Sequence, residues 1–222
     1  MSILDAIPSL TNPPSWLSSL PWGTVAEKAW SSARNLMGGS AANGVYEVLD
    51  YESTLELLNR QGTKALFKKR KRIRYLQDEV IAYQDYAWGD GEILVNYRSS
   101  PGRPVDRYRC GYKTYILLSL RGVRNKGDVD EFNIQWNIRR GFLKEDGFWG
   151  TGVSQPMRHI KSNVIFPRSR PPQQLSMEES NLRKTAPLGR DAQRQLPDGR
   201  WLVTWEMDNP RLHELYVLRW IW

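Results

Sequence analysis

Residues whose types and spacing could do chemistry gather in one basic run, Phe67-Lys-Lys-Arg-Lys-Arg-Ile-Arg74. Six of the seven residues from Lys68 to Arg74 are basic. In an extended strand, alternate side chains project from one face about 6.5 to 7 Å apart, which is close to the spacing of phosphates along a nucleic-acid strand. We therefore predict that one face of a strand binds an anionic partner through Lys68, Arg70, Arg72 and Arg74.

The opposite face of this strand is amphipathic, because Lys69 and Lys71 share it with Phe67, Ile73 and Tyr75. Two lysines on a face that would otherwise enter the core favour an edge strand. Charged side chains on an edge discourage pairing with other molecules. The run therefore has a second interpretation, in which it protects the edge of a sheet and binds nothing.

Basic residues continue beyond this run, and tyrosines lie between them. Stacking of bases on aromatic rings beside a cationic groove uses these residue types. The sequence does not show whether the side chains converge, and it contains no RNP aromatic signature, GXXG loop or zinc-finger spacing. Nucleic-acid binding is therefore an alternative function. The residues concerned are Arg98, Arg103, Arg107, Arg109, Lys113, Arg121, Arg124, Lys126, Arg139 and Arg140, with Tyr97, Tyr108 and Tyr112.

The sequence holds few combinations of residues that could support catalysis. The only histidines are His159 and His213, the only cysteine is Cys110, and no Walker loop, GxGxxG or HExxH motif occurs. Carboxylates cluster at 85–92 and 128–131, where calcium binding is an alternative to turn chemistry. A hydrolase with paired carboxylates also stays open, because such acids converge in space and not in sequence. We predict a non-enzymatic protein with no catalytic residues, no metal site and no cofactor.

The composition indicates a folded, basic chain. Hydrophobic residues make up 40% of the 222 residues and ten are tryptophans, so a large core can form. The formal net charge of +8 favours anionic partners such as nucleic acid, anionic lipid or an acidic protein. A single cysteine excludes an internal disulfide and a thiolate zinc cage. Because we find no signal peptide and no apolar run of about 20 residues, we expect a cytoplasmic protein.

From residue 45 onward the hydrophobic pattern has a period of two, as in strands with one buried face. Frequent turn signals between the apolar runs predict an all-β fold, an antiparallel β-sandwich of about eight strands in Ig-like or jelly-roll order. A hairpin is expected around residues 59–62, and the polar residues 167–198 predict a long loop with a helical turn near 177–183. The strands are predicted at 45–58, 65–76, 80–86, 92–97, 112–120, 132–138, 160–166, 201–206 and 216–222.

The chain ends on an aromatic strand, Tyr216-Val-Leu-Arg-Trp-Ile-Trp222. Tyr216, Leu218, Trp220 and Trp222 share one face, which is large and apolar. We predict that this face belongs to the core. Membrane insertion and glycan stacking are the alternatives.

Residues 1–44 form an N-terminal arm that differs from the predicted β domain of residues 45–222. Thr24-Val-Ala-Glu27 is a capping box and Gly38-Gly39 is a stop signal. The arm therefore predicts one short amphipathic helix followed by a Gly/Ala linker. The residues predicted to dock on a partner are Trp16, Trp22 and Trp30.

These observations favour a non-enzymatic interaction or adaptor protein, a subunit of a larger assembly. The first expected partner is a protein bound through the N-terminal arm, while the basic strand contacts an anionic surface. Two alternatives remain. A nucleic-acid-binding protein would lose affinity steeply with salt, and a peripheral membrane-active or pore-forming protein would be captured by liposomes that carry anionic lipid.

Overall fold

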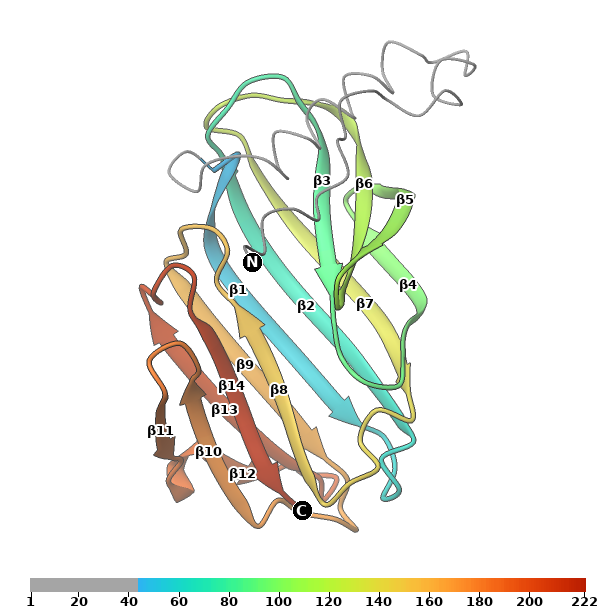
Figure 1. Cartoon of the computed structure of the whole chain (residues 1–222), viewed down its shortest axis with the longest axis vertical. Coiled ribbons are helices and arrows are strands. Elements are labelled where there is room, and N and C mark those ends of the chain that lie inside the picture. The colour runs from blue at the N-terminus through green and yellow to red at the C-terminus, as the bar shows by residue number, and fades with distance from the viewer. Residues whose placement is uncertain (1–43) are drawn as a thin grey trace, which may run out of the picture.

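The computed structural model of the chain describes residues 44–222, which fold almost entirely into strands (Figure 1). Within this range the one helical element is a short 3-10 turn, η3 (Arg190–Ala192). The prediction of an all-β fold is therefore confirmed. The predicted helix and linker of the N-terminal arm lie outside the described residues. In the part of the chain that the structure describes, no helix is long and apolar enough to cross a membrane.

Fourteen strands follow one another along residues 44–222, more than the sequence predicted. They are β1 (Tyr46–Leu57), β2 (Lys64–Tyr75), β3 (Val80–Ala87), β4 (Glu92–Ser100), β5 (Arg103–Cys110), β6 (Lys113–Arg124), β7 (Val129–Arg139), β8 (Asp146–Gly152), β9 (His159–Phe166), β10 (Gln174–Glu179), β11 (Lys184–Pro187), β12 (Gln193–Gln195), β13 (Trp201–Asp208) and β14 (Leu215–Ile221).

Three sheets make two layers (Figure 1). The large sheet has seven strands in the order β12-β13-β9-β1-β2-β7-β4, and its neighbours are antiparallel except for β1 and β9. In Figure 1 two smaller sheets lie in front of it, β11-β10-β14-β8 and β3-β6-β5. Strands β8 and β3 are edges of these two sheets and are not paired with each other. The front layer is therefore split above a continuous back layer.

The C-terminal strand β14 belongs to the core, as the sequence predicts. Its apolar face, Tyr216, Leu218, Trp220 and Trp222, is buried. Trp220 packs edge-to-face against Phe166, with the ring centroids 5.4 Å apart. Strand β14 pairs with β10 on one side and with β8 on the other, so it lies inside the four-stranded sheet. The aromatic residues at the end of the chain are therefore core residues.

Strand β2 lies in the middle of the large sheet, so the prediction of an edge strand is wrong. It pairs with β1 through the predicted hairpin and with β7 on its other side. The prediction failed because two lysines on the inner face were expected to need water. Lys69 instead reaches Asp85 on the facing sheet, and the Lys71 ammonium lies over the rings of Tyr46 and Tyr83. Partners on the front layer and on β1 therefore allow a central strand to carry lysines on its inner face.

Residues 174–187 form the hairpin β10–β11, and not the predicted loop with a helical turn. All four residues of β11 are exposed, so this strand carries no hydrophobic alternation that its sequence could reveal. Strands β5 and β8 were missed for related reasons. Strand β5 is exposed and rich in arginine, and β8 contains three glycines. In each case pairing with a neighbouring strand, and not a local pattern, holds the segment extended.

Candidate binding sites

The outer face of β2 presents the residues that the sequence predicts as an anion-binding ribbon. Two of them are already paired with carboxylates on the neighbouring strands. Arg70 lies 2.5 Å from Asp50 on β1 and 3.2 Å from Glu131 on β7. Arg74 lies 3.0 Å from Glu47 on β1. Opposite charges that face each other across strands attract, so these carboxylates offset part of the positive charge of the ribbon.

Lys68 and Arg72 complete the ribbon. Both are exposed, and neither forms an ion pair within residues 44–222. Binding of an anionic partner by the four ribbon residues stays a prediction. The acidic neighbours make such binding less favourable, because an anionic partner would compete with carboxylates that the protein itself supplies.

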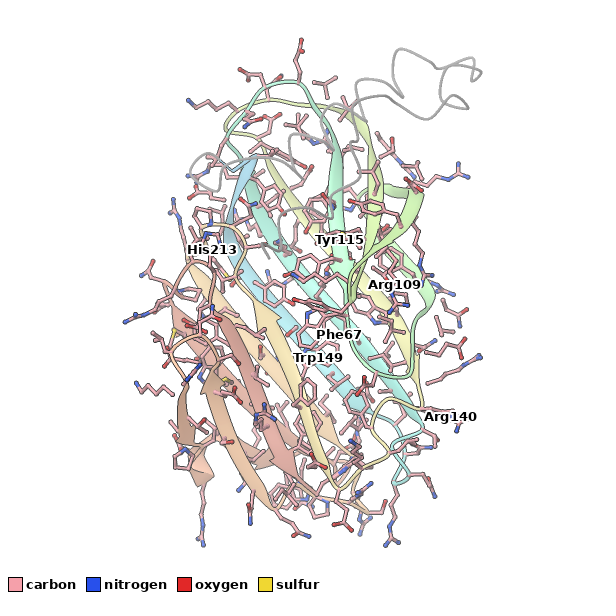
Figure 2. All side chains as sticks on the ribbon, viewed as in Figure 1. Phe67, Arg109, Tyr115, Arg140, Trp149 and His213 are labelled. Atoms are coloured by element: carbon pink, nitrogen blue, oxygen red, sulfur yellow. The ribbon has the colours of Figure 1, made fainter. Side chains whose placement is uncertain are left out.

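The two histidines and the cysteine do not form a catalytic group. The Nδ1 atom of His159 lies 2.8 Å from the carboxylate of Asp50 on the outer face of the large sheet. Cys110 is exposed at the end of β5, and Figure 2 shows its chain neighbour Arg109 far from His213. Among the described residues, no group of three or more His, Cys, Asp or Glu side chains is placed to hold a metal ion.

A second basic region lies on the sheet β3-β6-β5. Residues 98–124 contain seven basic residues and one acidic residue, Asp106. On the edge strand β5, Arg103, Arg107 and Arg109 are exposed. None of these three arginines forms an ion pair within the part of the chain that the structure describes. Their charges are not offset locally, so they favour the approach of an anion.

Tyrosine rings form a row across the same sheet. Tyr108 on β5 stacks on Tyr115 on β6, with the ring centroids 5.2 Å apart and the ring planes 13° apart. Tyr86 on β3 follows, with its ring centroid 6.0 Å from that of Tyr115. The Lys113 ammonium lies 4.9 Å from the centre of the Tyr86 ring. Tyr115 is the register partner of both other tyrosines, so the row crosses all three strands on one face.

Trp88, directly after β3, extends this row towards the four-stranded sheet. Its ring centroid lies 6.3 Å from that of Phe148 on β8 and 6.3 Å from that of Tyr112, in the turn between β5 and β6. The indole rests on the backbone of β8, where a Cβ on Gly150 would come within 2.8 Å of it. Tyr112 is 70% exposed and Phe148 is 41% exposed. Part of the row is therefore open to a ligand.

The structure brings together two of the three tyrosines that the sequence singled out among the basic residues. Tyr108 and Tyr112 lie in or beside the aromatic row, whereas Tyr97 is partly buried and donates a 2.9 Å hydrogen bond to Asp85. The sequence analysis did not name the remaining aromatic residues as site residues. The sequence offered one sign of them: Tyr86 and Trp88 are two positions apart, and this spacing places both side chains on one side of a strand. These residues are Tyr86, Trp88, Tyr115 and Phe148.

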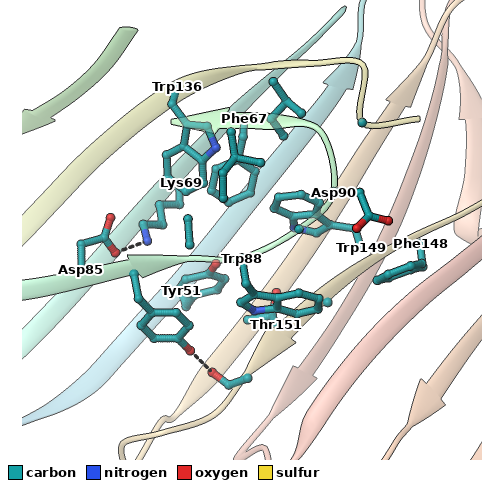
Figure 3. Close-up of a pocket in the computed structure, with 18 of the residues that line it drawn as sticks. Tyr51, Phe67, Lys69, Asp85, Trp88, Asp90, Trp136, Phe148, Trp149 and Thr151 are labelled. Atoms are coloured by element: carbon teal, nitrogen blue, oxygen red, sulfur yellow. Dashed lines mark hydrogen bonds and ion pairs between the residues drawn. The ribbon is translucent and has the colours of Figure 1, made fainter. Parts of the chain in front are cut away.

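A cleft of about 270 Å³ separates the two front sheets where β3 faces β8 (Figure 3). Strands β1, β2 and β7 of the large sheet line its floor. Aromatic rings line much of it: the Phe67 centroid lies 4.3 Å from that of Trp136 and 4.6 Å from that of Trp149. The cleft exists because β3 and β8 are not joined by backbone hydrogen bonds.

A buried ion pair lies in this cleft. Lys69 on β2 pairs with one oxygen of Asp85 on β3, and the hydroxyl of Tyr97 donates to the other oxygen (Figure 3). The Lys69 ammonium also lies 5.3 Å from the centre of the Trp136 ring. Burial lowers the pKa of Lys69, and Asp85 opposes that shift because it favours the charged amine. Each oxygen of Asp85 therefore already has a donor.

Lys71 also lines the cleft but has no carboxylate partner among the described residues. Its ammonium lies 4.9 Å from the centre of the Tyr46 ring and 5.5 Å from that of Tyr83. It donates a long hydrogen bond of 3.4 Å to the Tyr46 hydroxyl. Burial lowers the pKa of Lys71 from 10.5 to about 8, and the charge of Asp85 acts in the opposite direction. Lys71 is therefore a cation in surroundings made mainly of rings.

The third set of predicted site residues, Trp16, Trp22 and Trp30, lies outside the described residues. Docking of a protein partner through these tryptophans stays a prediction from the sequence. The binding surfaces that the structure can assess are therefore the face of the β3-β6-β5 sheet, the outer face of β2 and the cleft.

No family model matches the chain, and no curated protein matches it. Solved structures with a similar arrangement include a protein from Parabacteroides distasonis that is proposed to be a protease, with a TM-score of 0.49 and 10% identity over 82% of this chain and 41% of that chain. Another is the M1 zinc metallopeptidase from Deinococcus radiodurans, with a TM-score of 0.45 and 12% identity over 79% of this chain and 42% of that chain. The aligned part is less than half of either solved chain, and likeness at these scores says nothing about the activity of this chain.

Proposed function

We propose that this chain is a non-enzymatic interaction protein, and that its anionic partner is single-stranded nucleic acid bound across the β3-β6-β5 sheet. One observation carries the proposal. Tyr108 stacks on Tyr115, and Tyr86 follows on the same face of the small sheet. The exposed arginines of β5 have no carboxylate partner within the described residues, and Arg107 and Arg109 alternate with Tyr108, so a bound strand would contact both rings and charges at the β5 edge.

The chemistry of the partner follows from this combination. Proteins that bind single strands join a positively charged track for phosphates to aromatic rings on which bases stack. A duplex offers phosphates but keeps its bases paired and stacked. The tyrosines of the row, and Tyr112 beside them, would therefore find no free base to stack on. Anionic lipids likewise supply charge without flat rings. The exposed rings therefore favour a single strand among the anionic partners that the net charge suggests.

Fluorescence anisotropy with labelled single-stranded oligonucleotides tests the proposal on the full chain. The variant R103S/R107S/R109S removes three unpaired charges from β5. We expect its affinity at moderate salt to fall at least tenfold and the slope of log affinity against log salt to become shallower by about two, since each phosphate contact contributes about 0.7 for a single strand.

The chain offers a matched control on the other basic strand. The variant K64S/K68S/R72S removes three exposed charges from β2, none of which has an ion-pair partner within the described residues. We expect it to bind nearly as tightly as the wild type. A larger loss in this control than in the β5 variant would return the binding site to the ribbon on β2.

Stacking is tested separately from charge. Replacing Tyr112 by Ala removes the most exposed ring of the row and should weaken binding by about 1–3 kcal/mol, the range found for single base–aromatic stacks. Duplex of the same length should bind more weakly than the single strand. Equal affinity for duplex and single strand would contradict the stacking part of the proposal.

A further inference from the structure

The cleft between β3 and β8 holds several hydrogen-bond donors that are not fully satisfied within the described residues. The Lys71 ammonium has three protons and one long hydrogen bond. The indole N–H groups of Trp136 and Trp149 line the same cleft, are buried and have no acceptor within the described residues. Each oxygen of Asp85 already accepts a hydrogen bond. Buried donors are rarely left without an acceptor, so these groups indicate one that the described chain does not supply.

The charge of the cleft is also incomplete. Its lining holds four basic and three acidic side chains, which leaves one positive charge unmatched: Lys69, Lys71, Arg140 and Lys144 against Asp85, Asp90 and Asp146. The tyrosines around Lys71 do not supply the missing negative charge, because burial raises the pKa of each of them. The titratable groups that face Lys71 are Tyr46 and Tyr51 on β1, Lys69 on β2, and Tyr83 and Asp85 on β3.

The shape of the cleft favours a flat apolar body. Figure 3 shows the rings of Phe67, Trp136 and Trp149 on one side of the cleft and those of Tyr51 and Trp88 below them. Aromatic rings pack well against another ring in offset or edge-on arrangements. A volume of about 270 Å³ suits a small organic molecule and not a polymer.

We propose that this cleft binds a small aromatic carboxylate. The carboxylate group accepts hydrogen bonds from Lys71 and completes the charge of the cleft, while the ring packs among Phe67, Trp136 and Trp149. A monoanion matches the single unmatched charge, whereas a phosphate dianion would leave negative charge in a buried site. This site adjoins the row of tyrosines on the front sheet, because Tyr86 and Trp88 line the cleft as well.

Calorimetric titration of the full chain with naphthalene-2-carboxylate tests the proposal, with 2-naphthylmethanol as the uncharged analogue. At pH 7 we expect the carboxylate to bind at least tenfold more tightly than the alcohol. Above about pH 8 its affinity should fall about tenfold per pH unit as Lys71 loses its proton, while the affinity of the alcohol stays constant. Equal affinity for the two compounds, or carboxylate binding that does not change between pH 7 and pH 10, would overturn the proposal.

A pair of variants on one strand locates the site. K71M removes the inner charge and keeps a chain of similar length, so the carboxylate should bind no more tightly than the alcohol and the pH dependence should vanish. K68M, on the outer face of β2, should behave as the wild type. Carboxylate binding that persists in K71M would place the anion elsewhere, for example on the arginines of β5, and would refute the assignment. If K71M does not fold, the pH titration of the wild-type chain decides the question.

Discussion

Strand β2 places its cations in two opposite surroundings. On the outer face, Arg70 and Arg74 lie in partly exposed ion pairs with several carboxylates of β1 and β7. On the inner face, Lys69 pairs with Asp85, whereas Lys71 has no carboxylate partner within the described residues, and aromatic rings surround both. Exposed pairs are screened by water and contribute about 0–1 kcal/mol, whereas removal of one partner from a buried pair is far more costly. The same residue types therefore have different consequences at different depths.

The arginines of β5 are a third group of cations, and they show the effect of a missing neighbouring strand. Strand β2 has a strand on each side, and both supply carboxylates to its outer face. Strand β5 is an edge with one neighbour, β6, and the β6 residues opposite it include no carboxylate. Arginines on β5 therefore keep their charge available, although β5 is less basic in sequence than β2. Position in the sheet, more than the density of charge along the chain, therefore decides whether the arginines of a strand have carboxylate partners.

The two faces of β2 should differ most in the stability that is lost when a carboxylate partner of each face is removed. Asp85→Ala leaves Lys69 charged and unpaired in the interior, and we expect a loss of about 3–5 kcal/mol in the free energy of unfolding. Glu131→Ala removes one of several partners of Arg70 on the outer face and should cost less than about 1 kcal/mol. Urea denaturation of both variants checks the comparison. Losses that agree within the error of the measurement would show that depth does not distinguish the two faces.

The pH dependence of stability should include a contribution from Lys71 on the inner face. Burial lowers the pKa of Lys71 to about 8, so above that pH the folded chain has lost a proton that the unfolded chain keeps up to its ordinary value near 10.4. The contribution of Lys71 to stability then rises with pH between about 8 and 10, because at this group the unfolded state binds more protons. We expect K71M to be more stable than the wild type by about 1–3 kcal/mol at pH 7, and this gain should shrink by pH 10. A gain that stays constant over this range would contradict the depressed pKa.

The smallest effect is expected for a single outer-face arginine. Arg74→Ser removes a pair with Glu47 in which the arginine side chain is 41% exposed, so the loss should be at most about 1 kcal/mol. Salt screens such a pair, and the difference from the wild type should disappear in 1 M sodium chloride. Thermal unfolding at low and high salt measures this. A loss of stability that is large and insensitive to salt would mean that the ion pairs on the outer face have a structural role like that of the buried pair.

The sequence predicted the alternation of β2 correctly but not the position of the strand in the sheet. A period of two placed Lys68 and Arg72 outward and Lys69 inward, as the structure has them. It did not predict that Asp85, from the facing layer, would neutralise an inner lysine. Whether a buried charge has a partner depends on contacts between layers, and such contacts leave no periodic trace along the chain.

The same limit applies to the candidate sites. The sequence supplied the arginines and tyrosines of residues 98–124, and their convergence followed only from the pairing of β3, β6 and β5. The cleft was not predicted, because it arises where β3 and β8 fail to pair. Glycines in a strand often mark a close approach by another group, so Gly150 was the one local sign of the contact with Trp88.

The split of the front layer also bears on how copies of the chain meet. It gives the molecule two additional edges, β3 and β8, and an edge strand with free backbone groups invites pairing with a strand of another molecule. Trp88 packs against a face of β8 at Gly150, beside this edge. One indole therefore extends the aromatic row and at the same time connects it to one of the two additional edge strands.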